Sequence, residues 1–237
     1  MTDDGSSLPG LVEALRTTGA CRDFTDEPVA DDMLARVLDT ARFAPSGGNK
    51  QGWRVVVVQD PAVRRELRDQ YLPGWYDYLA MTMAGVRPWA PTNDPSVEAE
   101  ATAEAAAVAE SVAASGGGFA EHLDEAPVLL ALFADLSVLA AVDRDHDRYS
   151  FAGGASVYPF AWNLLLAARA EGLGGVITTM AIRREDEVKA LLRAPDHVAL
   201  AAVIALGHPV RKTMRLSRGA VAEFASIDAF DGRAFGG

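Results

Sequence analysis

Ala44-Pro-Ser-Gly-Gly-Asn-Lys-Gln-Gly-Trp53 separates an amphipathic helix pattern from a strand pattern that contains four consecutive valines. Pro45 cannot continue the helix, because its ring blocks the preceding turn and its nitrogen has no proton to donate. We therefore expect the helix to end at Pro45 and the strand to begin at Trp53. Between them, Ser46 and the two glycines that follow allow backbone amides to turn outward.

Asn49 and Gln51 add two side-chain amides to this loop, and an amide donates and accepts hydrogen bonds at once. Such a loop suits a flat heteroaromatic ring in which carbonyls alternate with ring nitrogens, such as an isoalloxazine. The loop holds neither a nucleophile–base pair nor a set of metal ligands. Taken alone, it is explained better as a helix-to-strand connector whose glycines turn the chain.

Three more segments are distinctive for their glycines and basic residues. The first is Arg16-Thr-Thr-Gly-Ala-Cys-Arg-Asp-Phe24, which is followed by Glu27-Pro-Val29. The second is Asn163-Leu-Leu-Leu-Ala-Ala-Arg-Ala-Glu-Gly-Leu-Gly-Gly175, and the third is Leu206-Gly-His-Pro209, with Arg218 beyond it.

Taken in this order, the four segments resemble the FMN-dependent nitroreductase family. The resemblance covers about residues 11–224 and is weakest over 72–125. It implies an α+β fold, in which a central, mainly antiparallel sheet is flanked by helices. It also implies an intertwined homodimer that binds FMN at its interface.

The resemblance points to basic residues that would meet the FMN phosphate, which is a dianion and needs cations. Arg22 and Arg218 match basic positions of the family, Arg16 is a third candidate, and Arg215 competes with Arg218. The family usually carries Arg-Arg-Ser or a relative of it where this chain has Thr18-Gly19-Ala20. This departure removes side-chain donors, so two backbone amides and the threonine hydroxyl would serve instead.

Two further segments would contact the flavin ring by the same resemblance. From the neighbouring subunit, the loop would contribute Pro45, Ser46, Gly47 and Asn49, and Gln51 adds its amide. The residues after the glycine-rich turn, Ile177, Thr178 and Thr179, match the segment laid along the ring. Their backbone N–H groups would meet its N5 edge, and strand residues with no ligand role are the alternative.

Composition limits the classes of function. The 237 residues suit one substantial domain, and 33 acidic against 22 basic residues give a net charge of -11. That balance argues against nucleic acid and against an anionic membrane surface. The N-terminus lacks the pattern of a secretion signal, and Cys21 is the only cysteine. We expect a cytoplasmic protein with no disulfide and no metal site.

Periodicity and capping residues predict the elements. A first helix is expected over 8–17 with Ser6 or Ser7 as its cap, a second begins with Asp31 as its cap, and a third begins at Asp60-Pro61. Three more helices are expected over 97–114, 156–169 and 184–192. Strands are expected over 53–59, buried on both faces, and over 128–133, 176–180 and 198–206.

Two regions fall outside this regular pattern of a single domain over 1–237. Residues 72–119 are expected to form an excursion that covers the site, or else a plain surface insertion. Aromatic residues from Tyr71 to Trp89 would then contact the substrate, although such clusters more often pack in a core. The tail over 219–237 carries Phe224, Phe230 and Phe235, which it cannot bury alone. We expect the tail to wrap around a partner subunit.

The function implied is an FMN-dependent oxidoreductase of nitroreductase type. NADH or NADPH would reduce the flavin, and a nitroaromatic, quinone or similar small acceptor would then take the electrons in a ping-pong sequence. No protein side chain is expected to be catalytic, because the flavin carries the chemistry. The alternatives are a flavin-cleaving or reductively dehalogenating relative on the same scaffold, or a flavin-binding protein without catalysis.

Overall fold

The computed structural model describes residues 10–211 and 215–236. Within them, four strands form one antiparallel sheet in the order β1-β2-β4-β3. Their bounds are β1 Trp53–Val57, β2 Val128–Asp135, β3 Gly174–Thr178 and β4 Val198–Gly207. The central strands β2 and β4 consist almost entirely of apolar residues, and β2 is buried along its whole length. The antiparallel sheet expected from the sequence is confirmed.

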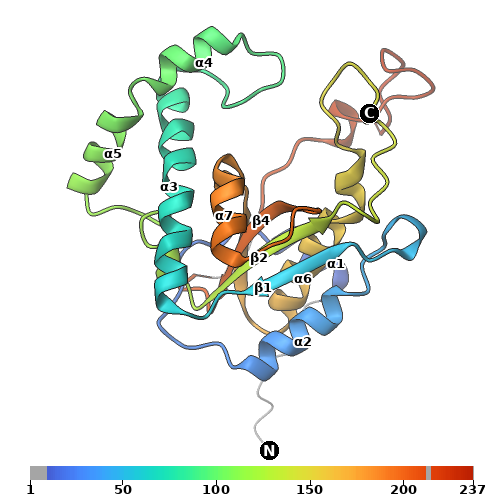
Figure 1. Ribbon diagram of the computed structural model, residues 1–237. Helices are drawn as coiled ribbons and strands as arrows, with labels where there is room; N and C mark the ends of the chain where they lie inside the picture. Colours follow the sequence, from blue (N-terminus) through green and yellow to red (C-terminus); the bar gives the residue numbers. More distant parts are fainter. Residues whose placement is uncertain (1–9, 212–214, 237) are drawn as a thin grey trace, which may run out of the picture.

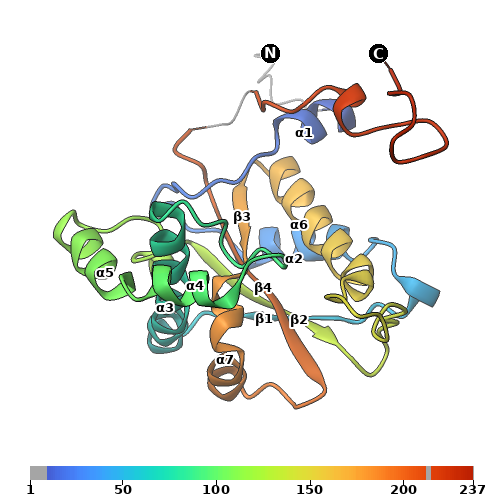
Figure 2. The same cartoon turned by 90° about the horizontal axis from the view of Figure 1, so that it is seen from above.

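Helices cover both faces of the sheet, which makes three layers (Figure 2). One face packs against α2 (Asp31–Ala41) and α6 (Tyr158–Ala170), through residues such as Val37 and Leu164. The other packs against α3 (Pro61–Met83) and α7 (Glu185–Leu192), through Leu67 and Val188. These four side chains have no exposed surface, so they lie in the interior of the two cores.

The short helices complete the described chain. They are α1 Leu11–Thr17, α4 Pro95–Thr102 and α5 Ala105–Ala114, with 3-10 turns η1 Gly47–Asn49, η2 Leu123–Glu125, η3 Ala152–Ser156, η4 Met180–Arg184 and η5 Val221–Glu223. The expected caps Ser6 and Ser7 lie outside the described residues. In the part of the chain that the structure covers, none of the helices combines the length and apolar character that a membrane crossing needs.

The strand after the loop corrects one expectation. β1 ends at Val57 rather than at Gln59, and its middle residues are only half-buried. Among the described residues β1 pairs only with β2, so it is an edge strand of the sheet. A run of valines marks a strand, but it does not tell an edge strand from a central one.

The helix before the loop differs from two further expectations. α2 begins with Asp31 as a helical residue and has no side-chain cap. The carboxylate of Asp31 instead accepts a hydrogen bond from the side chain of Gln59 at 3.2 Å. α2 ends at Ala41, four residues before Pro45, because Arg42 and Phe43 already form a turn. By contrast, α3 begins at Asp60-Pro61 as expected, and the structure shows Asp60 as its cap, accepting from the Ala62 N–H at 2.7 Å.

The region over 72–119 begins inside a long helix. α3 runs unbroken through Pro73 to Met83, and α4 and α5 then project from the body of the protein (Figure 1). The single helix expected over 97–114 is two helices, which are separated at Ala103 and Glu104. The start of this region, with Leu72 and Trp75, therefore packs against the core, whereas α4 and α5 lie outside it.

Candidate cofactor site

The turn after α1 pairs with the start of β3. The N–H of Cys21 donates to the carbonyl of Gly175 at 2.8 Å, and Ala20 and Gly175 form a parallel bridge. Farther along, the N–H of Thr25 donates to the carbonyl of His208 at 2.8 Å. Three of the four segments that carry the family resemblance therefore meet at one edge of the sheet.

Two glycines at the start of β3 allow close packing, one against the turn and the other against β4. A Cβ on Gly174 would lie 2.9 Å from the Cβ of Cys21, and one on Gly175 would lie 2.8 Å from the carbonyl oxygen of Ala205. Both distances are too short for a carbon atom, so a side chain on Gly174 would push the turn away from β3, and one on Gly175 would push β3 away from β4.

The fourth segment, the loop that contains Asn49, lies at the opposite edge and opposite end of the sheet (Figure 2). Through β2, Trp53 is aligned with Ala199 at the start of β4, whereas Gly175 is aligned with Leu206 near its end. The two corners are therefore roughly 14 Å apart across the sheet and roughly 24 Å apart along it. Within one chain, the loop does not reach the other three segments.

The loop is a compact turn with its own hydrogen bonds. Asn49 and Gln51 have φ values of 52° and 50°, which are uncommon for residues other than glycine. The backbone N–H of Gln51 donates to the Ser46 hydroxyl at 2.9 Å, and its side-chain amide donates to the Asn49 carbonyl oxygen at 3.2 Å. These bonds fix the direction of both amides.

A residue far along the chain also holds the loop. The N–H of Gly47 donates to the hydroxyl of Ser156, in η3, at 3.0 Å. No sequence pattern pointed to Ser156, because its role depends on a contact between distant segments. Pro45 is exposed at the start of the loop.

Arg16 lines one cavity together with Arg215 and Arg218, the two alternative candidates for the phosphate contact. The cavity has a volume of about 850 Å³, and its lining includes Arg16, Arg215 and Arg218. Val12 and Leu15 give it an apolar wall. The lining also includes Glu13, but three arginines outnumber this one carboxylate, so the surface has a net positive charge and suits an anion.

Arg22 lies elsewhere. It lines a concavity of about 560 Å³ between residues 22–26 and 118–127, together with His122 and Glu125. Arg22 and Arg218 were both expected to meet one phosphate, but they line separate cavities of a single chain.

Thr178, at the end of β3, is paired with a buried tyrosine. The hydroxyl oxygens of Thr178 and Tyr71 are 3.0 Å apart. Burial raises the pKa of Tyr71, and the positive charge of Arg22 acts in the opposite direction. Tyr71 is only 2% exposed, so of the two interpretations of the aromatic residues this one follows the alternative, packing in the core rather than in a cover over the site. Tyr71 lies four residues after the buried Leu67, and this helical spacing is the sequence signal that could have placed Tyr71 on the core side of α3.

The residues on either side of Thr178 differ in their surroundings. Ile177 packs partly against the core. Thr179 lies just after β3 and is exposed, and its carbonyl accepts a hydrogen bond from the Ile182 N–H at 3.0 Å.

Thr18 offers a test of whether the turn fits a phosphate-bearing cofactor. It is buried, and among the described residues its hydroxyl has no hydrogen-bond partner. Thr18 and Gly19 line one small recess beside the strand. Buried hydroxyls without partners are uncommon, and acceptor oxygens at this turn would satisfy the group. The turn and the neighbouring arginine cavity therefore fit a ligand that carries a phosphate.

The acidic loop Asp143-Arg-Asp-His-Asp147 is organised by one buried carboxylate rather than by solvent. Asp143 accepts hydrogen bonds from the Phe151 N–H, the Ser150 hydroxyl and the Arg148 guanidinium, and these bonds lower its pKa. In the described residues, no group of three or more His, Cys, Asp or Glu side chains is placed to hold a metal ion.

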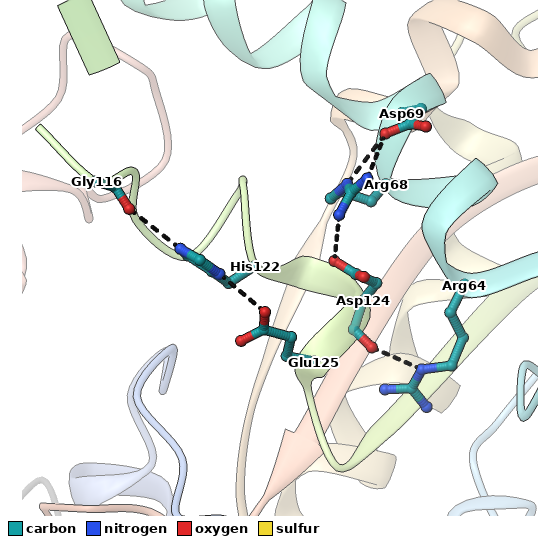
Figure 3. Close-up of polar contacts among 7 residues, drawn as sticks. All are labelled: Arg64, Arg68, Asp69, Gly116, His122, Asp124 and Glu125. Carbon is teal, nitrogen blue, oxygen red and sulfur yellow. Dashed lines mark hydrogen bonds and ion pairs between the residues drawn. The ribbon is translucent and has the colours of Figure 1, made fainter. Parts of the chain in front are cut away.

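A polar network fixes the segment that forms the wall of the Arg22 cavity (Figure 3). His122 lies between the carboxylate of Glu125, at 3.1 Å, and the carbonyl of Gly116, at 3.2 Å. Nearby, Arg68 donates to the carboxylate of Asp124 at 3.0 Å and so ties the same segment to α3.

Comparisons with known proteins agree with this arrangement. The model of the nitroreductase family matches residues 15–208. NADH dehydrogenase from Thermus thermophilus is 29% identical over 81% of this chain and 82% of its own length. A 5,6-dimethylbenzimidazole synthase from Rhodospirillum rubrum is 29% identical over 90% of each chain. A crystal structure of oxidised iodotyrosine deiodinase bound to FMN and 3-iodo-L-tyrosine superposes with a TM-score of 0.63, at 23% identity, over 93% of this chain and 100% of that one.

The layered α+β fold is therefore the fold of the iodotyrosine deiodinase structure. Because the family model covers most of the sequence, the chain belongs to the nitroreductase family.

Proposed function

We propose that this protein is an FMN-dependent oxidoreductase that works as a homodimer. Relatives with oxidoreductase names support the class, and the FMN-bound structure of a protein with the same fold supports the cofactor. When bound, FMN supplies the redox chemistry: a nicotinamide gives it hydride and leaves, and a nitroaromatic, quinone or similar acceptor takes the electrons in the same pocket.

In this proposal, the corner beside β3 binds the phosphate end of the cofactor. Arg16 and Arg218 neutralise the dianion, and the unpartnered hydroxyl of Thr18 donates to a phosphate oxygen. Backbone amides of Gly19 and Ala20 take the place of the family's usual side chains. Arg22, from its separate cavity, provides positive charge nearer the ring, where charge develops on reduction.

The second copy of the chain supplies the loop. The observation that carries this step is the diagonal separation of the loop from the β3 corner within one chain. The loop's fixed amides, on Asn49 and Gln51, would meet the flavin of the partner subunit. A homodimer completes two such sites by symmetry.

The relatives also support a second candidate class. One has the name of a synthase and another that of a deiodinase, so oxygen-dependent flavin cleavage or reductive dehalogenation is the alternative. A cofactor-binding protein without turnover is the non-enzymatic alternative.

An anaerobic two-step experiment separates these functions. FMN-loaded protein is mixed with NADH or NADPH, and the loss of oxidised-flavin absorbance is followed. A nitroaromatic, a quinone and an iodinated phenol are then added in separate samples. We expect bleaching by a nicotinamide and rapid recovery with a nitroaromatic or quinone. Iodide release, or loss of the flavin itself when oxygen is admitted, would favour the alternative. A flavin that no nicotinamide reduces would contradict the proposed function.

A further inference from the structure

Side chains, rather than neighbouring backbone, hold the end of the loop that contains Asn49. Gln51 has a left-handed backbone, with a φ of 50°, which is unfavourable for a residue that has a Cβ. Its N–H donates to the Ser46 hydroxyl at 2.9 Å, and its carbonyl accepts from the Arg54 guanidinium at 3.2 Å. Both backbone polar groups of Gln51 are therefore bonded to side chains that favour this conformation.

Arg54 is itself held by a buried carboxylate. Its guanidinium lies 3.1 Å from the carboxylate of Asp135, the last residue of β2, which is only 6% exposed. Hydrogen bonds from Ser137 lower the pKa of Asp135, and the charge of Arg54 lowers it further. The carboxylate is therefore ionised at neutral pH and fixes the position of the guanidinium.

The planar guanidinium bridges the strand end and the loop. One of its nitrogens donates to the carbonyls of Gln51 and Trp53, the second at 2.8 Å, while the other donates to Asp135. A guanidinium has only donors, so the direction of each bond is fixed. The backbone N–H of Asp135 also donates to the Gly52 carbonyl at 2.6 Å. The end of β2 thus holds two successive carbonyls of the loop, one directly and one through Arg54.

We propose that Arg54 is a positioning residue for the cofactor site, because it holds the carbonyl of Gln51 and so directs the side-chain amides of Gln51 and Asn49. The Gln51 amide donates to Asn49, and both side chains lie on the exposed surface of the loop. The inference rests on the proposed shared site, in which these amides meet the flavin of the partner subunit. Arg54 acts through Gln51 and does not touch the flavin.

The first measurement uses protein without FMN, so it is independent of the cofactor. In Arg54→Gln, hydrogen exchange of residues 46–52 should quicken roughly five-fold, the effect of losing one net hydrogen bond. The Arg54 side chain is 57% exposed, so its ion pair adds little to global stability. The Tm should therefore fall by less than about 4 °C.

The second measurement is a titration with FMN and with riboflavin, which lacks the phosphate. Because the loop would contact the ring, Arg54→Gln should weaken the binding of both flavins by the same factor, roughly five-fold. Arg54→Lys keeps the charge but not the planar pair of donors, so it should behave like Arg54→Gln. Arg36→Gln is the matched control: Arg36 is an exposed arginine of α2, paired with two carboxylates, and both flavin affinities should be unchanged.

A double-variant comparison tests whether Arg54 acts through Gln51. Gln51→Gly removes the amide and accepts the positive φ without strain. In that background, Arg54→Gln should weaken flavin binding by less than about two-fold, because the amide that it positions is already absent. A full five-fold loss in the double variant would show that Arg54 acts by another route and would overturn the inference.

The remaining outcomes are distinct. Unchanged exchange of the loop in Arg54→Gln, or faster exchange with unchanged affinity for both flavins, overturns the positioning role while the proposed function stands. Full recovery in Arg54→Lys assigns the effect to charge alone, and a larger fall in Tm makes Arg54 a general structural residue, so either result also overturns the inference. A wild-type protein that binds no FMN overturns the inference and the proposed function together.

Discussion

Arginines around the N-terminal turn differ in what surrounds them, and this difference separates their roles. Arg16 and Arg218 line one cavity, while Arg22 lines another near Tyr71. Riboflavin, which has the ring of FMN but no phosphate, distinguishes a phosphate contact from a contact near the ring.

Arg22→Ala should weaken FMN binding by about 1.5–3 kcal/mol, the range for a hydrogen bond to a charged group. If Arg22 acts near the ring, riboflavin binding weakens as well. Arg218→Ala should weaken FMN binding but leave riboflavin unaffected. Fluorescence titration measures both ligands, with Arg65→Ala, an exposed residue of α3, as the control. Unchanged FMN affinity in Arg22→Ala would remove this residue from the site.

A second prediction for a single residue concerns the buried carboxylate of Asp143. Hydrogen bonds from Phe151, Ser150 and Arg148 favour the carboxylate and hold its pKa below the ordinary value. A lowered pKa stabilises the folded state above the unfolded value, near 3.9, and this contribution fades as the pH falls through the folded pKa. Asp143→Asn should therefore lower the Tm at pH 7, and the difference from wild type should shrink below about pH 4.

Thermal unfolding followed at pH 7 and at pH 3.5 measures this effect. Asp145→Asn, in the same loop but exposed, should unfold like wild type at both pH values. An equal loss of Tm in Asp143→Asn at both values would show that the charge of Asp143 is not what stabilises the loop.

Among the elements, the segment after α5 depends on a histidine with acceptors on both ring nitrogens. Glu125 and the Gly116 carbonyl raise the pKa of His122 because both favour the protonated ring (Figure 3). A raised pKa stabilises the segment below the unfolded value, near 6.5, and the contribution is lost as the pH rises through the folded pKa.

Hydrogen exchange of residues 112–125, corrected for the intrinsic rate at each pH, should therefore be slower at pH 6 than at pH 8. His122→Ala should remove this difference, whereas His146→Ala, in another exposed loop, should retain it. A pH difference that persists in His122→Ala would assign it to other groups.

Elements with strong patterns could be predicted from the sequence, and the exceptions have physical causes. β2 is apolar up to its last residue, Asp135, and α6 has a proline in its first turn, so both were predicted closely. Pro73-Gly74 was different, because this pair is typical of a break but lies inside α3. A Cβ on Gly74 would lie 2.6 Å from the Met180 carbonyl oxygen, so the glycine allows α3 to pack against η4. Such contacts between distant segments leave no local pattern.

The candidate site likewise has parts that local sequence patterns predict and parts that they do not. The N-terminal turn, the glycine-rich turn and the Gly-His-Pro segment were predicted to belong together, and the structure brings them to one corner. Tyr71 and Ser156 were missed as contacts, because each acts through a residue more than 100 positions away.

For the whole molecule, the tail leaves large apolar surfaces uncovered in a single chain. Phe224 is 76% exposed, Phe235 is 59% exposed and Phe230 is fully exposed. Exposed apolar side chains in such a cluster usually mark an interface. Together with the diagonal separation of the loop from β3, they support a second copy of the chain as the partner.

Deleting residues 227–237 should therefore loosen the dimer and lower the amount of FMN retained. Light scattering of the truncated and full-length proteins over a dilution series measures the first effect, and flavin absorbance measures the second. Phe151→Ser, which removes an exposed ring outside the tail, is a control. A truncated protein that stays dimeric with full FMN would show that the tail does not hold the partner.

The central claim is that two chains together bind FMN, one per subunit, and native mass spectrometry of the full-length protein loaded with FMN tests it most directly. The account predicts a dimer that carries two FMN molecules, with an oxidised-flavin spectrum in solution, and no monomer with FMN bound. A monomer that retains FMN would contradict the shared site, and a protein that binds no FMN at all would contradict the proposed function.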